Sequence, residues 1–257
     1  MAIRPLPVPL MKDKVARVAV IGVTGAIGSA FSDCVMELFP AATLLAAGRT
    51  LPLRESKDNQ TAPVCIGGLD LGDEDSIRDV CAQLVSGGMP DLVLVATGIL
   101  HDGDAFPERS LKELDKGAME HLLAVNLIGP SLIMKHLLPH VPRKGAFRMG
   151  VLSARVGSIS DNQLGGWYSY RTSKAGLNMM IKGAAIELKR RNREAVLVGL
   201  HPGTVESALS DPFQRNVPSN KLFTPEHAAH RLIEVLLSRS AEQSGLCFDW
   251  AGKEIAP

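Results

Sequence analysis

Short apolar runs and helical patterns alternate along almost the whole of this 257-residue chain. The first run, residues 15–22, is rich in β-branched residues and shows no regular polar alternation, which indicates a strand covered on both faces. Similar runs predict strands at 43–47, 64–69, 91–97, 146–153, 195–200 and 246–249. Helical patterns lie at 26–39, from about 73, and at 111–138, 170–191 and 224–238. The alternation predicts an α/β fold, a doubly wound parallel sheet with helices on both faces.

Composition and charge favour a single globular domain over residues 15–257. The chain is 46% hydrophobic, its formal net charge is +1, and no linker-like stretch divides it, so no nucleic-acid partner is expected. No uninterrupted apolar run reaches the roughly 20 residues that span a bilayer, so no membrane partner is expected. Residues 1–14 are expected to form a loose leader and not a signal peptide. The four cysteines form no Cys-x-x-Cys pair, which predicts neither a metal site nor disulfides and favours a cytoplasmic location.

The junction between the first strand and the first helix is rich in glycine. The sequence there is Gly22-Val-Thr-Gly-Ala-Ile-Gly28. Gly22 lets the chain turn, and Gly28 lets the helix approach the strand closely. The free backbone N–H groups and the helix dipole of such a turn suit a pyrophosphate. An ordinary βα turn is the alternative, but the place at the first βα junction favours a dinucleotide site in a Rossmann-type sheet.

Arg49 follows the second strand directly, where the adenosine ribose of a dinucleotide lies in such folds. An acid at this place would bind the ribose 2′-hydroxyl, whereas a guanidinium pairs with a 2′-phosphate. Arg49 therefore favours NADP(H) over NAD(H), with a surface arginine of no function as the alternative. Asp70, after the third strand, is expected either to contact the adenine amine or to cap the next helix.

Tyr170 and Lys174 lie four residues apart in a helical pattern and therefore share one helix face. An ammonium beside a phenol would stabilise the phenolate and lower the pKa of Tyr170 from about 10, giving a proton donor usable near neutral pH. The spacing alone is weak evidence, because such pairs are common on solvated helices. Tyr168 has the uncharged Thr172 at the same spacing, so only Tyr170 has a cationic partner.

These motifs occur in an order that resembles the classical short-chain dehydrogenase/reductase (SDR) family over almost the whole chain. The matching pieces are Gly22-x-x-x-Ala26-Ile27-Gly28, Gly48-Arg49, Asp70-Leu71, Ala96-Thr97-Gly98, Asn126, Ser153, Tyr170-x-x-x-Lys174 and Pro202-Gly203. Longer stretches, such as Pro107-Glu-Arg-Ser-Leu and His201-Pro-Gly-Thr-Val, resemble the branch of the C-factor signalling proteins and the sniffer-type carbonyl reductases. The resemblance implies a single-domain Rossmann-type fold and an NAD(P)-dependent oxidoreductase.

The resemblance also implies a role for each matched residue. Tyr170 would be the general acid in carbonyl reduction, Lys174 would tune it and bind the nicotinamide ribose, and Asn126 would hold a water. Ser153 is the serine candidate of the same catalytic group. A polar helix residue facing solvent is the alternative for Asn126. The implied cofactor-binding residues are Gly22, Thr24, Gly25, Ala26, Ile27, Gly28, Arg49, Asp70, Leu71, Ala96, Thr97, Gly98, Tyr170, Lys174, Pro202, Gly203, Thr204 and Val205.

The chain departs from the family pattern at three places. The middle glycine of the first turn is Ala26, which helical dihedral angles tolerate. The family's Asn-Asn-Ala-Gly is Val95-Ala-Thr-Gly here, so Thr97 must supply any polar contact. The family's Ser-Ser-x-x-Gly is Ser153-Ala-Arg-Val-Gly, which puts Ala154 in the place of the serine that polarises the substrate carbonyl. Adjacent strand residues face opposite ways, so Ser153 cannot replace it without a register change, and Ser158 is another candidate.

The sequence therefore predicts an NADP(H)-dependent reductase or dehydrogenase acting on a small carbonyl or secondary alcohol. Ala154 motivates an alternative, a catalytically weak protein of the same fold that senses nucleotide or carries a signal. Trp167, His101, Met149 and a lid at residues 207–222 are expected to form an apolar substrate pocket, and simple packing is the alternative for the aromatic and Met side chains. The helices that hold Asn126 and Tyr170 are where family members pair, so a homodimer or homotetramer is expected.

Overall fold

The fold is an open parallel sheet between two layers of helices. The computed structural model describes residues 15–50, 62–101, 106–216, 218 and 221–257, so the predicted leader at 1–14 lies outside the described residues. The sheet order is β10-β9-β6-β5-β4-β1-β2-β3, and every neighbouring pair is parallel except β9 and β10. Its strands are β1 (Arg17–Ile21), β2 (Thr43–Ala47), β3 (Val64–Ile66), β4 (Leu92–Val95), β5 (Arg148–Leu152), β6 (Val196–His201), β9 (Cys247–Asp249) and β10 (Glu254–Ile255).

The order of the strands reverses between β1 and β4, and parallel sheets bind ligands in a crevice at the carboxyl ends of the strands where their order reverses. The predicted single-domain, doubly wound Rossmann-type fold is confirmed; most strands are shorter than predicted, whereas β2 has the predicted bounds. All four residues of β4 are buried, as expected of a strand covered on both faces. The antiparallel edge strand β10 and a separate pair, β7 (Thr204–Val205) with β8 (Leu222–Phe223), had no distinct sequence signal.

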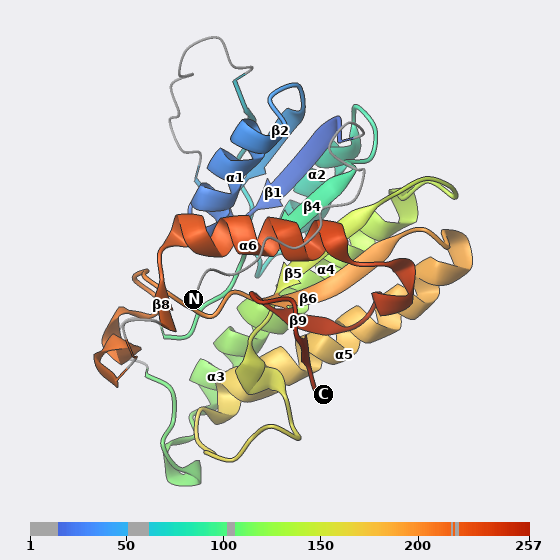
Figure 1. The fold of residues 1–257 in the computed structure, drawn as a ribbon. Coiled ribbons are helices and arrows are strands. Elements are labelled where there is room, and N and C mark those ends of the chain that lie inside the picture. The colour runs from blue at the N-terminus through green and yellow to red at the C-terminus, as the bar shows by residue number, and fades with distance from the viewer. Residues whose placement is uncertain (1–14, 51–61, 102–105, 217, 219–220) are drawn as a thin grey trace.

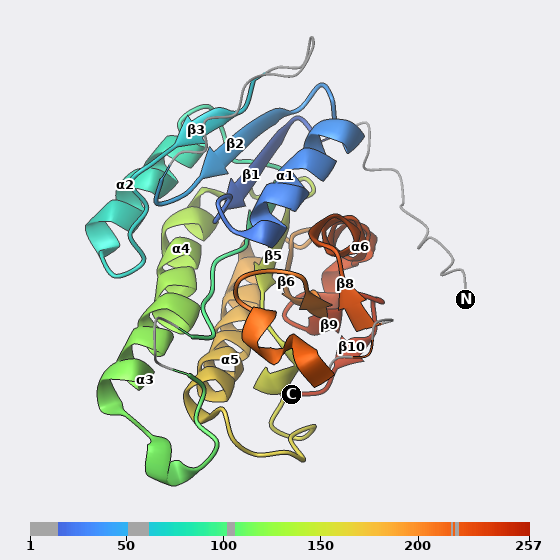
Figure 2. The ribbon, with the colours of Figure 1, turned by 90° about the vertical axis from the view of Figure 1, so that its left-hand side faces the viewer.

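Helices cover both faces of the sheet (Figures 1 and 2). One layer holds α1 (Ala26–Leu38) and α6 (Pro225–Ser238), which pack against each other and over one hydrophobic core. The opposite layer holds α2 (Glu74–Val85), α4 (Gly129–Leu137) and α5 (Tyr168–Arg191), with α3 (Lys116–Leu123) extending from α4 beside α5. Met149 on β5 is fully buried in this second core, so its predicted place in a substrate pocket is wrong.

The single helix predicted over 111–138 is divided into several parts. A short 3₁₀ turn (Leu111–Glu113) comes first, and Asp115 caps α3 by accepting the N–H of Ala118 at 2.8 Å. A π-helical turn (Ala124–Ile128) then separates α3 from α4. Pro130 follows this turn and has no N–H to donate to residue 126, so a regular α-helical ladder cannot continue there. The division matters because the π-helical turn contains Asn126.

The same stretch, Lys116–His140, is long enough to span a membrane, and its most apolar window of 18 residues has a mean hydropathy of 1.4. Among the described residues, no other helix is long and apolar enough to span a membrane. Of the most apolar window of this stretch, 39% is buried inside the protein. Of its two α-helical parts, α3 packs against α5 and α4 packs against α2.

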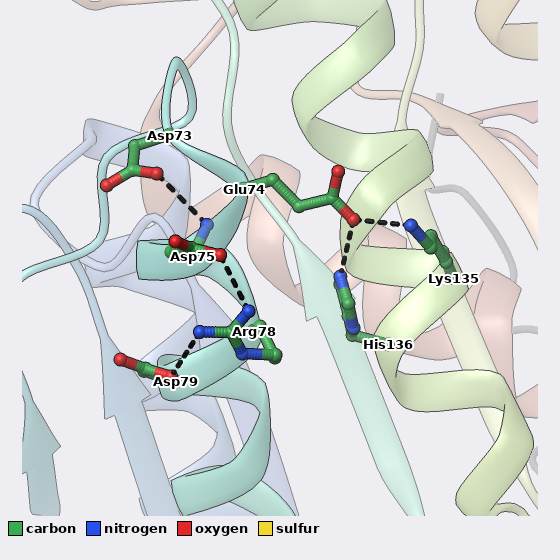
Figure 3. Close-up of polar contacts among 7 residues, drawn as sticks. All are labelled: Asp73, Glu74, Asp75, Arg78, Asp79, Lys135 and His136. Carbon is green, nitrogen blue, oxygen red and sulfur yellow. Dashed lines mark hydrogen bonds and ion pairs between the residues drawn. The ribbon is translucent and has the colours of Figure 1, made fainter.

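A polar contact fixes the N-terminus of α2 against α4. Glu74 Oε1 accepts a hydrogen bond from Lys135 Nζ at 2.5 Å and lies 3.0 Å from His136 Nε2 (Figure 3). The bond from Lys135, and then that from His136, lowers the pKa of Glu74. Asp73 caps α2 by accepting the N–H of Asp75 at 3.0 Å, which confirms the predicted helix start. The contact thus connects α2, the helix that follows β3, to α4, the helix that follows Asn126.

Candidate active site

Residues from five strand ends line the crevice at the carboxyl edge of the sheet. Gly22, Gly48, Ala96, Ser153 and Pro202 directly or closely follow β1, β2, β4, β5 and β6. In a parallel sheet these ends lie along one edge, and a ligand binds where the strand order reverses. The fold therefore brings most of the predicted site residues to one side of the molecule.

The glycine turn is packed too tightly for side chains at two positions. Gly22 has a φ of +93°, and a Cβ on Gly28 would lie 2.2 Å from the Gly22 carbonyl oxygen. Gly25 is the N-cap of α1 and has no side chain to cap the first N–H groups of the helix. Ala26 is the first residue of α1, which explains why alanine is tolerated there. Ile27 and Thr24 belong to the same turn, and the Thr24 methyl would lie 3.6 Å from a Cβ on Gly48.

Thr97, in the loop that follows β4, packs its methyl group against this turn. A Cβ on Gly22 would meet the Ala96 carbonyl at 3.0 Å and the Thr97 methyl at 3.1 Å. Thr97 Oγ1 is buried and has no hydrogen-bond partner among the described residues. An unpartnered buried hydroxyl, beside the uncapped start of α1, fits a crevice that takes a polar, anionic ligand. The residues present thus fit a dinucleotide.

Arg49 and Asp70, the residues predicted to lie near the adenosine of the cofactor, follow β2 and β3. Arg49 is exposed after β2. Asp70 Oδ1 accepts the N–H of Gly72 at 2.8 Å, and its own N–H donates to Ser76 Oγ at 2.8 Å. Since Asp73 is the N-cap of α2, the alternative that Asp70 caps this helix is wrong. Leu71 packs close to α4, because a Cβ on Gly129 would lie 2.9 Å from its side chain.

Lys174 is buried at the centre of the site. Its ammonium donates to the Leu152 carbonyl at 3.0 Å and lies 5.8 Å from the centroid of the Tyr170 ring. Burial lowers the pKa of Lys174 to about 8 and raises the pKa of Tyr170 to about 12. The predicted lowering of the tyrosine pKa is therefore wrong for the protein alone, because desolvation of the phenolate outweighs the cation. Both residues lie on one face of α5, as their spacing predicts.

Asn126 is fully buried, so the alternative that it faces solvent is wrong. Its Oδ1 accepts the N–H of Ile99, and its Nδ2 donates to the Ile99 carbonyl, both at 2.8 Å. Nδ2 also lies 3.3 Å from Ser173 Oγ. A Cβ on Gly98, whose φ is +159°, would lie 3.2 Å from Asn126 Oδ1 and 3.4 Å from Lys174 Nζ. Gly98 is thus the point where the β4 loop, the π-helical turn and α5 meet.

Serine hydroxyls beside β5 are engaged with protein groups. Ser153 Oγ donates to Asn178 Oδ1 at 2.6 Å, and Ser158 Oγ accepts the N–H of Asp161 at 3.1 Å. Ala154, between them, is extended and buried, with a φ of −150°. The following 3₁₀ turn (Arg155–Gly157) lies against α5, since a Cβ on Gly157 would be 2.8 Å from the Lys174 carbonyl carbon.

The opposite wall of the site is aromatic. The Phe213 ring lies 5.1 Å from Trp167, whose ring lies 6.2 Å from Tyr170, measured between centroids. Phe213 belongs to a 3₁₀ helix (Asp211–Asn216) inside the predicted lid, and His101 Nε2 lies 3.2 Å from the Ala208 carbonyl oxygen. The structure thus brings His101 and Trp167 together with the lid segment, and it adds Phe213, which no sequence signal had singled out.

The start of the predicted lid is held by backbone pairing. Thr204 and Val205 in β7 pair with Leu222 and Phe223 in β8. Gly203, after Pro202, has a φ of +81°, and a Cβ there would lie 2.6 Å from the Phe223 ring. The two ends of the segment are therefore joined, while its opening and closing remain a prediction.

Burial of Lys174 gives a testable pH dependence. The pKa of Lys174 is about 8 in the folded protein and 10.5 in its ordinary state, so between these values the unfolded chain binds a proton that the folded protein has lost. The contribution of Lys174 to the free energy of unfolding therefore rises with pH across this window. Urea unfolding of the protein without cofactor, at pH 7 and pH 9.5, is expected to show the stability advantage of Lys174→Met shrinking at the higher pH. An advantage that stays constant would contradict the buried ammonium.

Comparisons with known proteins agree with this geometry. Residues 16–217 match the short chain dehydrogenase family. A 1-hydroxy-2-glutathionyl-2-methyl-3-butene dehydrogenase of Rhodococcus sp. (strain AD45) is 30% identical over 209 residues, which cover 81% of this chain and 80% of that protein. The C-signal of Myxococcus xanthus is 30% identical over 146 residues, which cover 57% of this chain and 82% of that protein.

Solved structures share the fold at lower identity. The NADPH-bound carbonyl reductase from chicken fatty liver gives a TM-score of 0.78 at 23% identity, with 95% of this chain and 99% of that chain covered. The carbonyl reductase Sniffer of D. melanogaster gives 0.76 at 19% identity, with 94% and 99% covered. Fold and family match define an NAD(P)-dependent oxidoreductase. The chain belongs to the short-chain dehydrogenase family, in agreement with the resemblance found in its sequence.

Proposed function

We propose that this protein transfers a hydride between NADP(H) and a carbonyl or secondary-alcohol substrate, with Tyr170 as the general acid and base. The observation that carries the proposal is the meeting of Asn126, Lys174 and Gly98 at one buried point, with Lys174 Nζ 5.8 Å from the Tyr170 ring centroid. Lys174 and Tyr170 share one face of α5, whereas Asn126 and Gly98 belong to distant parts of the chain. Only the fold therefore brings these four residues together.

Each residue has a defined task in the proposed reaction. Bound nicotinamide would supply or accept the hydride, and the glycine turn with Thr97 would hold the dinucleotide. Tyr170 would give its proton to the carbonyl oxygen during reduction and take it back during oxidation. Lys174 would lower the pKa of the phenol once the cofactor completes the site, and Asn126 would hold a water that passes the proton onward. Pro202, Gly203 and Thr204 would cover the nicotinamide.

A catalytically weak protein that senses nucleotide or carries a signal is the second candidate. Ala154 favours it, because no hydroxyl stands where the family places its carbonyl-polarising serine. A panel of aldehydes, ketones and quinones, followed by NADPH absorbance, separates the candidates. An oxidoreductase is expected to turn over at least one compound with saturation. NADPH binding without turnover of any of them would reject the proposed reaction and support the sensor.

Arg49 is expected to select NADPH over NADH. Its exposed guanidinium follows β2, where it would pair with the 2′-phosphate. Charge-assisted hydrogen bonds contribute about 1.5–3 kcal/mol, so Arg49→Ala is expected to weaken NADPH binding about 10- to 100-fold and to leave NADH binding nearly unchanged. Titration of both cofactors by nicotinamide fluorescence measures the change. Equal affinity of the wild-type protein for both would refute this interpretation of Arg49.

We also propose that the protein forms a homodimer or homotetramer in the cytoplasm. Met179, Met180 and Ile186 are exposed on α5, and the two methionines line a groove of about 730 Å³ formed by residues of α4 and α5. Apolar residues gathered on one helical face are typical of an interface between copies. Sedimentation velocity is expected to give a dimer or larger species, and a monomer at all concentrations would reject this part.

A further inference from the structure

We propose that Glu108 is a positioning residue, which sets the first turn of α5 and thereby the place of Tyr170. The inference rests on the proposed function of Tyr170 for its catalytic readout. Glu108 lies in the loop before the 3₁₀ turn Leu111–Glu113, about 60 residues from the helix that it contacts. Although Glu is usually exposed, this side chain is 6% exposed, which marks it as part of a built contact.

Three hydrogen bonds join Glu108 to the start of α5. The Glu108 carbonyl accepts the N–H of Trp167 at 2.5 Å, and Oε2 accepts the N–H of Ser169 at 3.2 Å. Oε1 accepts the hydroxyl of Ser169, which is itself buried. Ser169 directly precedes Tyr170. The carboxylate therefore satisfies backbone and side-chain donors in the one helical turn that holds the proposed acid.

The chain just before this helical turn has an unusual backbone conformation, which local bonds such as that from Arg171 Nε to the Gly166 carbonyl hold only in part. Gly165, Gly166 and Trp167 have φ values of +64°, +63° and +52°, so three successive residues are left-handed. Trp167 is the N-cap of α5 and makes no side-chain cap bond, and the first turn of α5 contains no acidic residue. A left-handed non-glycine residue persists only where its surroundings fix it. Glu108 supplies both the missing acceptor and the contact that fixes Trp167.

The contact of Glu108 with α5 also links Tyr170, the proposed proton donor, to the aromatic wall of the site. Trp167 stands between Tyr170 and Phe213, at centroid distances of 6.2 Å and 5.1 Å. Phe106, two residues before Glu108, lies 6.3 Å from Phe213 and completes this wall. Loss of the Glu108 contact would therefore displace the acid and the aromatic wall together. A displacement of about 1 Å at a reacting group can lower turnover about 10²-fold.

The test compares Glu108→Ala, Glu108→Gln and Ser169→Ala with the matched control Glu113→Gln. Glu113 is a carboxylate of the same loop, whose Oε2 accepts the N–H of Arg109 at 2.7 Å and does not bond α5. We expect kcat to fall about 10- to 100-fold in Glu108→Ala and less in Glu108→Gln, because the amide oxygen still accepts a hydrogen bond. NADPH affinity and the kcat of Glu113→Gln are expected to stay within about twofold of wild type.

Hydrogen exchange gives a readout that does not depend on turnover. The amides of residues 168–172 are expected to exchange faster in Glu108→Ala than in the wild type or in Glu113→Gln. If no substrate is turned over, the proposed function fails, and faster exchange still supports the positioning role. The inference would be overturned if Glu108→Ala kept the kcat and the exchange rates of the wild type. It would also be overturned if Glu113→Gln lost as much kcat as Glu108→Ala. If Glu108→Ala does not fold, Glu108→Gln and Ser169→Ala decide by the same two measurements.

Discussion

Replacing Tyr170 with phenylalanine is expected to lower kcat by about 10²- to 10⁴-fold, the usual contribution of a positioned general acid. The phenol is the proposed proton donor, and Lys174 Nζ lies 5.8 Å from its ring centroid. Phenylalanine keeps the ring that packs on Trp167 at 6.2 Å, so the wall of the site is preserved and only the hydroxyl is lost. NADPH oxidation with a substrate found in the carbonyl panel measures the loss, and NADPH titration is expected to show nearly unchanged affinity.

Tyr168→Phe is the matched control for this experiment. Tyr168 is the first residue of α5 and has the uncharged Thr172 four residues on. It is expected to keep kcat within about threefold of wild type, since no cation shares its helix face at this spacing. Turnover that survives in Tyr170→Phe, or that is lost equally in Tyr168→Phe, would remove the acid–base role from Tyr170.

The fold was predictable because its signals are local. Buried parallel strands are apolar without alternation, and turn glycines such as Gly22 and Gly28 are required by backbone contacts that leave no space for a Cβ. The parallel sheet and its two helical layers follow from that pattern and from the rules for parallel sheets, whereas the strand order was not predicted. The π-helical turn at Asn126 was not predictable in the same way, because a helical pattern does not show where an extra residue enters the ladder.

The site was predictable only in part, because several of its contacts join distant segments. Tyr170 and Lys174 were found by helical spacing, but the effect of burial on their pKa values depends on packing that no spacing shows. In the sequence, Glu108 is only part of a stretch that resembles the family. Its role was not predictable, because its hydrogen-bond partners lie about 60 residues away. Phe213 gave no signal, because a single aromatic residue in a polar segment is more often simple packing.

Restoring the missing hydroxyl is expected to raise activity. Ala154→Ser places a donor beside β5, in the position that the family pattern assigns to the carbonyl-polarising serine. The extended backbone of Ala154, with a φ of −150° and a ψ of 150°, accepts serine without strain. One preorganised donor to a developing oxyanion is worth about 10²- to 10³-fold in kcat. An increase of about 10-fold or more in kcat for Ala154→Ser, with unchanged NADPH affinity, is therefore the expected result.

Ser158→Ala shows whether another hydroxyl already performs this task. Ser158 Oγ accepts the N–H of Asp161 at 3.1 Å, and its own proton is still available to donate. If Ser158 polarises the substrate, its removal lowers kcat strongly and Ala154→Ser adds little to the wild-type protein. If the site lacks a donor, Ser158→Ala leaves kcat nearly unchanged and Ala154→Ser raises it. Because Ala154 is adjacent to the turn that packs on Lys174, a gain confined to kcat would identify the missing hydroxyl, and not the fold or the cofactor site, as what limits the reaction.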